Sequence, residues 1–231
     1  MSHSLLSAVA MGDGRVHSAL KRARISRLEG ERAIDELCSK NLLKREYSLE
    51  SPPIDDEKID EKLNFSTPFM RFWFAFVSPY FKTIKDGDFK ESKEQFSNRK
   101  SDFYELTFRK LSHELIKKSF KEDKIAEIGS YWDRNNQIDI LAKTASGKIV
   151  AGICKYSSQK AKKSELTKLQ EQCRLAELNP DICIIVSKGG FSNELKALKG
   201  EDVKLFGLKN FKTLIEDLSE KDFIECVGKK Y

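Results

Sequence analysis

Residues 137–156 read QIDILAKTASGKIVAGICKY, two apolar runs joined by a turn. The first run contains Asp139 and the second contains Lys155. Because TASG between them is typical of a turn, the stretch predicts a β-hairpin. Burying an ionisable side chain in a strand is costly unless something compensates its charge. The aspartate and the lysine therefore indicate either a functional site or an internal ion pair between adjacent strands.

The segments on either side of the hairpin predict an α/β fold with a mixed central sheet. In chain order, the patterns predict a helix over 101–120, strands over 124–133, 137–143 and 148–156, a helix over 162–178 and a strand over 181–188. The last of these strands is apolar throughout, which is typical of a strand buried on both faces. The first helix has an apolar stripe made of Phe103, Leu106, Leu111, Leu115 and Ile116. Shorter patterns over 191–200, 203–208 and 211–220 add a helix, a strand and a last helix.

The N-terminal residues 1–50 predict a small, mainly helical winged helix-turn-helix domain. Ser26 is the expected N-cap of its third helix, with Glu29 three residues on, and Asn41 is suited to the helix end. Residues 51–66, with two prolines and a run of acids, are expected to be a linker. Residues 67–100 are predicted to form a connecting aromatic helix and a polar loop, and the domain containing the hairpin covers 101–231.

The composition restricts the class of protein only moderately. The 231 residues carry a net charge of +6, which is compatible with a polyanionic partner without requiring one. The five cysteines are scattered and the three histidines lie far apart, so no zinc framework is evident. No secretory signal and no apolar run long enough for a membrane span is present, so we expect a cytoplasmic protein.

The order of helix, three strands, helix and strand resembles the PD-(D/E)XK nuclease superfamily, best over 101–187. Asp139 and Lys155 match the aspartate and the lysine of that pattern, and Glu105 matches a glutamate on the preceding helix, with Glu114 as an alternative. Over nearly the whole chain, the sequence is similar to the C-terminal winged-helix and nuclease-like region of archaeal-type AAA ATPases. The ATPase domain itself is absent from this sequence, which has no phosphate-binding P-loop motif.

The resemblance implies a Mg²⁺ site held by Asp139 and Glu105, with Lys155 as the third catalytic residue. Mg²⁺ prefers hard oxygen ligands and would activate a water for phosphodiester cleavage. The sequence departs from the family pattern at Ile153, where the motif has a glutamate, which argues against full activity. Another carboxylate, for example Glu165 or Glu171, is an alternative third ligand.

Two basic clusters suggest a nucleic-acid surface. Arg22, Arg24 and Arg27 lie around the helix-turn-helix, although the third helix also carries several acids. The second cluster follows Lys155 and consists of Lys160, Lys162, Lys163 and Lys168. We therefore expect a DNA-associated protein that binds DNA with a degenerate metal site. The alternatives are a Mg²⁺-dependent endonuclease with a non-standard third carboxylate and a protein-interaction partner of a separate ATPase or of another complex. A homodimer is also compatible with the sequence.

Overall fold

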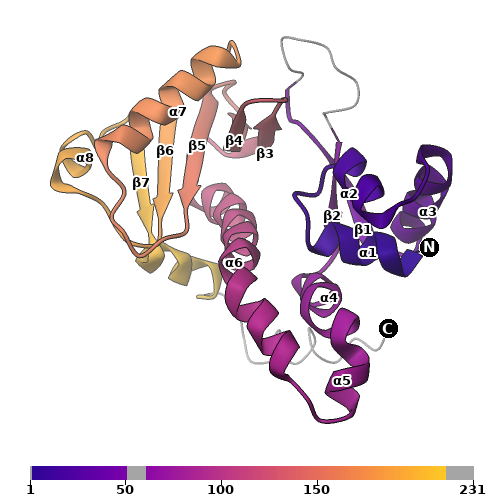
Figure 1. The fold of residues 1–231 in the computed structure, drawn as a ribbon. Coiled ribbons are helices and arrows are strands. Elements are labelled where there is room, and N and C mark those ends of the chain that lie inside the picture. The colour runs from indigo at the N-terminus through magenta and orange to yellow at the C-terminus, as the bar shows by residue number, and fades with distance from the viewer. Residues whose placement is uncertain (1, 51–60, 217–231) are drawn as a thin grey trace. The chain divides into compact units, whose positions relative to one another are not determined.

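The computed structural model describes residues 2–50 and 61–216 of the chain. These residues divide into two compact units (Figure 1). The first, here called the N-terminal unit, is Met1–Tyr104 with Trp132–Arg134. The second, the α/β unit, is Glu105–Tyr131 with Asn135–Tyr231.

The N-terminal unit begins with three helices and a two-stranded sheet. The elements are α1 (Ser2–Ala10), α2 (Val16–Ala23), α3 (Arg27–Ser39), β1 (Leu43–Tyr47) and β2 (Glu61–Phe65), with β1 and β2 antiparallel. The Ser26 side chain accepts a hydrogen bond from the Glu29 amide, and Asn41 adopts φ 54°, so both predicted ends of α3 are confirmed. Residues 61–65 were expected to be linker but form β2, whose Leu63 and Phe65 enter the core. Ser66 follows β2 and its amide donates to the Leu42 carbonyl, and the other linker residues, 51–60, lie outside the described residues.

An aromatic segment completes the core of this unit. It consists of α4 (Pro68–Phe72), a π-helical turn (Trp73–Val77), a 3-10 turn (Ser78–Tyr80) and α5 (Phe81–Lys85). Phe76 is buried and its ring lies 5.2 Å from that of Phe96. Phe69, which belongs to the predicted aromatic helix, is 65% exposed.

Helix α6 (Lys90–Ser119) is much longer than the helix predicted from residue 101. Residues 90–100 were expected to be loop because they are strongly charged. Asp88 accepts a hydrogen bond from the Lys90 amide at the start of the helix, and Phe96 packs on the N-terminal core. A few buried contacts therefore suffice to order a helix whose other faces are polar.

The α/β unit contains a five-stranded mixed sheet, which confirms the α/β fold. Its strands are β3 (Ile125–Trp132), β4 (Gln137–Thr144), β5 (Ile149–Lys155), β6 (Ile182–Ser187) and β7 (Val203–Gly207), in that spatial order. β4 and β5 are antiparallel, whereas β5, β6 and β7 run parallel. The helices are the part of α6 from Glu105 onward, α7 (Lys163–Leu175), α8 (Asn193–Ala197) and a 3-10 turn (Leu208–Leu214). The predicted last helix extends to residue 220, and residues 217–220 lie outside the described residues.

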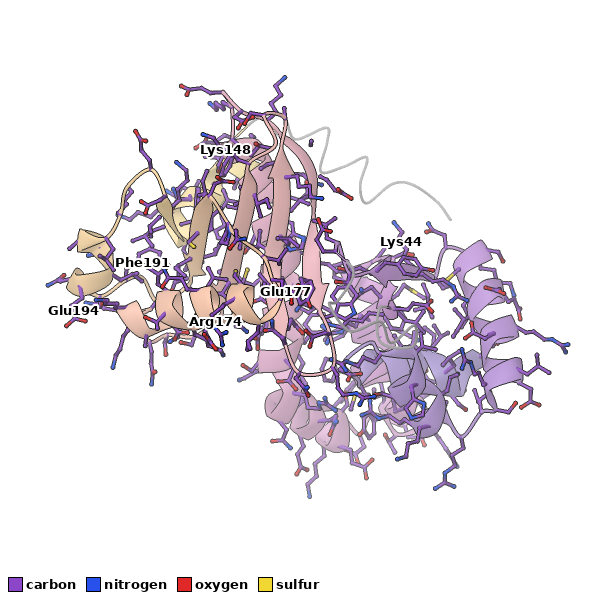
Figure 2. The ribbon with its side chains drawn as sticks, turned by 90° about the horizontal axis from the view of Figure 1, so that it is seen from above. Lys44, Lys148, Arg174, Glu177, Phe191 and Glu194 are labelled. Carbon is purple, nitrogen blue, oxygen red and sulfur yellow. The ribbon has the colours of Figure 1, made fainter. Side chains whose placement is uncertain are left out.

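The two long helices of this unit cover opposite faces of the sheet. On α6, Phe108 and Ile116 pack with Ile140, Val150 and Ile184, whose side chains share one face. Leu111, expected in this stripe, is instead 45% exposed. Helix α7 packs against β4, β5 and β6 from the other side. It can be found in Figure 2 by its labelled residue Arg174. Along the described part of the chain, no helix is both long and apolar enough to cross a membrane.

Candidate functional site

Asp139 stands where the pairing of β4 with β5 stops. The antiparallel register runs from Lys143 opposite Ile149 to Ile140 opposite Gly152. Just beyond it, the Cys154 amide donates to the Asp139 carboxylate at 3.0 Å. The side chain thus supplies an acceptor at the point where the ladder of backbone hydrogen bonds ends.

Several polar groups from neighbouring elements converge on Asp139. The second carboxylate oxygen accepts from Gln137 Nε2 at 3.1 Å and from Arg109 Nη1, on α6, at 3.5 Å. The Asp139 carbonyl accepts from Ser130 Oγ on β3 and from His113 Nε2 on α6, both at 2.7 Å. Because both carboxylate oxygens have donors and a guanidinium lies beside them, the negative charge is compensated within the protein.

Glu105 belongs to the same neighbourhood as Asp139 and Arg109. Glu105 and Arg109 are one helical turn apart on α6. Burial raises the pKa of the Cys154 thiol, and the negative charges of Asp139 and Glu105 add to this effect while the Arg109 guanidinium opposes it. Both predicted carboxylates therefore act on one buried sulfur atom.

Lys155 has a different counter-ion. Its ammonium binds the Glu165 carboxylate on the first turn of α7, and the side chains are 24% and 23% exposed. Asp139 and Lys155 therefore do not form the direct ion pair that the sequence offered as an alternative. The two charges are compensated by helices that cover opposite faces of the sheet. Arg109 of α6 binds Asp139, and Glu165 of α7 binds Lys155.

Glu114 and Glu171, the other acids considered as metal ligands, form ion pairs elsewhere. Glu114 pairs with Lys117 and Glu171 pairs with Arg174, both on exposed helix surface. Ile153 is buried, and no group of three His, Cys, Asp or Glu side chains that could hold a metal ion occurs among residues 2–50 and 61–216. Since Arg109 binds Asp139 and an isoleucine stands at 153, Asp139 and Glu105 are the two predicted oxygen ligands left in this neighbourhood.

The predicted DNA-binding lysines lie together at the start of α7. Lys160, Lys162 and Lys163 are exposed around the buried Ala161, and Lys168 is exposed further along the helix. Ala161 is held by hydrogen bonds that its amide donates to the Gly190 carbonyl and that its carbonyl accepts from the Ser192 amide, both 2.8 Å.

The predicted arginines of the N-terminal unit lie around α2 and α3. Arg22 donates to the Ala8 carbonyl at 3.1 Å, Arg24 ends α2 with φ 56°, and Arg27 begins α3. All three are exposed.

The acids of α3 have partners that the sequence did not reveal. Arg45 on β1 binds Glu31 at 3.1 Å and Asp35 at 2.8 Å, and also binds Glu61 on β2. Lys40 binds Glu36 at 2.5 Å. Two cations thus offset part of the acidic charge on this side of α3, whereas Arg24 and Arg27 have no acidic partner among the described residues.

Sequence reasoning missed Arg109, Gln137 and His113 as the partners of Asp139. A signal was present, because Glu105, Arg109 and His113 recur every four residues and so form one row on α6. Gln137 lies two residues before Asp139, on the same side of the strand.

A match to a known protein family lies in the middle of the chain. Residues 73–167 match a family model, DUF234, described as archaea bacterial proteins of unknown function. The matched segment includes Glu105, Asp139 and Lys155. The search of curated proteins and the search of solved structures each found no match.

Proposed function

We propose that this protein binds nucleic acid through the phosphate backbone and does not cleave it. The observation that carries the proposal is the cluster Lys160, Lys162 and Lys163, here called the lysine loop. Within 157–168 the sole acid is Glu165, and Lys155 already binds it. The lysine loop is therefore a surface of uncompensated positive charge, which suits phosphate contacts.

The N-terminal unit supports the same proposal. Arg24 and Arg27 flank the turn between α2 and α3, where a helix-turn-helix meets DNA. Arg24 and Arg27 place exposed positive charge at this turn, and Arg45 and Lys40 offset part of the acidic charge further along α3. We expect contacts here to position the protein on the duplex rather than to read its sequence.

The likeness to PD-(D/E)XK nucleases gives the proposal its structural context. The element order and the places of Asp139 and Lys155 in the sequence resemble that superfamily, while their partners come from different helices, so we regard the α/β unit as a nuclease-like domain with a degenerate site. The buried free cysteines, Cys154, Cys173 and Cys183, suit a reducing compartment, and we place the protein in the cytoplasm.

A gel-shift and nicking experiment tests both halves of this proposal. The full chain is incubated with supercoiled plasmid at low and high salt, with and without Mn²⁺. We expect retarded, intact plasmid at low salt and progressive release as salt increases.

Two other results would contradict it. Nicking that Asp139→Ala abolishes, and that the surface change Lys209→Ala leaves intact, would establish a metal-dependent nuclease. No retention at any salt would instead favour a protein-interaction module.

A further inference from the structure

We infer that the start of α7 and the ends of β5 and β6 form a seat for one phosphate group. This inference rests on the proposed function and names the contact that the α/β unit makes. The seat combines the first amides of α7, the Ser187 hydroxyl, the Lys155 ammonium and the lysine loop.

The first observation is a helix start without a cap. Lys162 precedes α7 with extended backbone, and its side chain makes no capping hydrogen bond. The amides of Lys163 and Ser164 have no hydrogen-bond acceptor in the described part of the chain, while that of Glu165 donates to the Lys162 carbonyl at 3.0 Å. Free amides at a helix start favour an anion, because they point outward at the positive end of the helix dipole.

The second observation is independent of the helix. The Ser187 hydroxyl is fully buried and has no hydrogen-bond partner among the described residues. Ser187 pairs with Lys155 across the parallel strands β5 and β6, so both side chains leave the same face of the sheet. Because Lys155 reaches Glu165 on the first turn of α7, the Ser187 hydroxyl lies on the face that this turn covers. A buried hydroxyl left unpaired is unfavourable, and a phosphate oxygen would satisfy it.

The surrounding backbone holds the seat in place. A Cβ atom on Gly189 would lie 2.3 Å from the Gln159 carbonyl oxygen, so the loops after β5 and β6 touch. The isolated bridge between Ala161 and Phe191 joins the same two loops just before α7. The seat thus lies outside the carboxyl ends of parallel strands, where α/β sheets commonly bind ligands.

Without phosphate, the Lys155 ammonium is paired with the Glu165 carboxylate. The half-buried Lys155–Glu165 pair stands over the face on which Ser187 lies. A phosphate oxygen that binds Lys155 must displace the Glu165 carboxylate, which then turns to solvent. Removing the charge of Glu165 should therefore tighten phosphate binding, a result that a purely structural ion pair would not give.

The test measures inorganic phosphate binding to the full chain by calorimetry, with a matched pair of variants. Lys163→Ala and Lys163→Pro both remove the lysine charge, but only proline removes the amide donor. Proline is tolerated at the first helical position, and the extended backbone of Lys162 suits a following proline. We expect Lys163→Pro to bind phosphate about fivefold more weakly than Lys163→Ala, and Ser187→Ala about fivefold more weakly than the unchanged protein. Glu165→Gln should bind more tightly.

The outcomes separate this inference from the proposed function. Equal phosphate binding by Lys163→Pro and Lys163→Ala, with no weakening in Ser187→Ala, would overturn the seat. Fluorescence anisotropy with a short labelled duplex then tests the source of the phosphate. If the duplex binds but ignores these changes, the seat is wrong and the proposed function stands. If phosphate binding follows the expected order and no duplex binds, the seat serves a small free phosphate compound and the proposed function fails.

Discussion

At the scale of single residues, the sequence identified Asp139 and Lys155 correctly as charges that need compensation. It could not identify their partners, because Arg109 is distant along the chain and an arginine on an amphipathic helix usually faces solvent. The structure shows Asp139 as an acceptor for the Cys154 amide and the Arg109 guanidinium. Its hydrogen bonds therefore account for the presence of a carboxylate at this position.

This role predicts a graded decrease of stability in two variants of Asp139. Asp139→Ala leaves the Cys154 amide and Arg109 unpaired, and we expect it to lower the free energy of unfolding by about 1–3 kcal/mol. Asp139→Asn keeps an acceptor for the amide and should cost less. Urea denaturation of the three proteins measures the order, and equal decreases in both variants would show that the hydrogen bond to the amide contributes nothing.

The Cys154 thiol should resist alkylation in the folded protein. Burial first, and the Asp139 charge second, raise its pKa, so the reactive thiolate is scarce at pH 8. Cys38 is the least buried of the four cysteines in the described ranges, and we expect it to react with iodoacetamide first. Mass spectrometry of peptides at successive times gives the order, and modification of Cys154 before Cys38 would contradict it.

At the scale of elements, periodicity predicted the order of helices and strands from residue 101 to 188. Strands β4 to β6 were recognisable because they are mostly apolar, with a turn between β4 and β5 and a polar helix between β5 and β6. The prediction failed for two segments, for different reasons. The charged first third of α6 looked like loop, and β2 lies next to a proline-rich stretch and was included in the linker.

Arg45 connects α3 to the two-stranded sheet, and its removal should affect both stability and binding. Burial lowers the pKa of Arg45, but hydrogen bonds to Glu31, Asp35 and Glu61 outweigh this and raise it overall. Arg45→Gln should lower the free energy of unfolding by about 1–2 kcal/mol, since solvent partly screens the network.

The same change should also weaken duplex binding, because it removes the cation that Glu31 and Asp35 share and so makes this side of α3 more negative. Lys44→Gln is the matched control, because Lys44 is an exposed neighbour of Arg45 on β1, and it should leave thermal stability unchanged. Thermal unfolding and anisotropy measure the two effects. Tighter duplex binding by Arg45→Gln would argue against an approach of the duplex near α3.

At the scale of the whole molecule, composition gave only a weak indication of a polyanionic partner. A net charge of +6 is common for a chain of 231 residues. The structure adds the information which charged side chains form ion pairs and which do not. Several acids outside the lysine loop are paired within the chain, at Arg45, Lys40, Arg109 and Arg174. The position of uncompensated charge depends on the tertiary structure, so a count of residues could not have predicted it.

The salt dependence of duplex binding tests the central claim most directly. The logarithm of the binding constant is measured against the logarithm of salt concentration for the full chain and for the variant Lys160→Ala/Lys162→Ala/Lys163→Ala. We predict a steep linear decrease for the full chain. In the variant, the slope should be smaller by about one unit for each phosphate that the removed lysines neutralise. An identical slope in both proteins, or no binding even at low salt, would contradict the account.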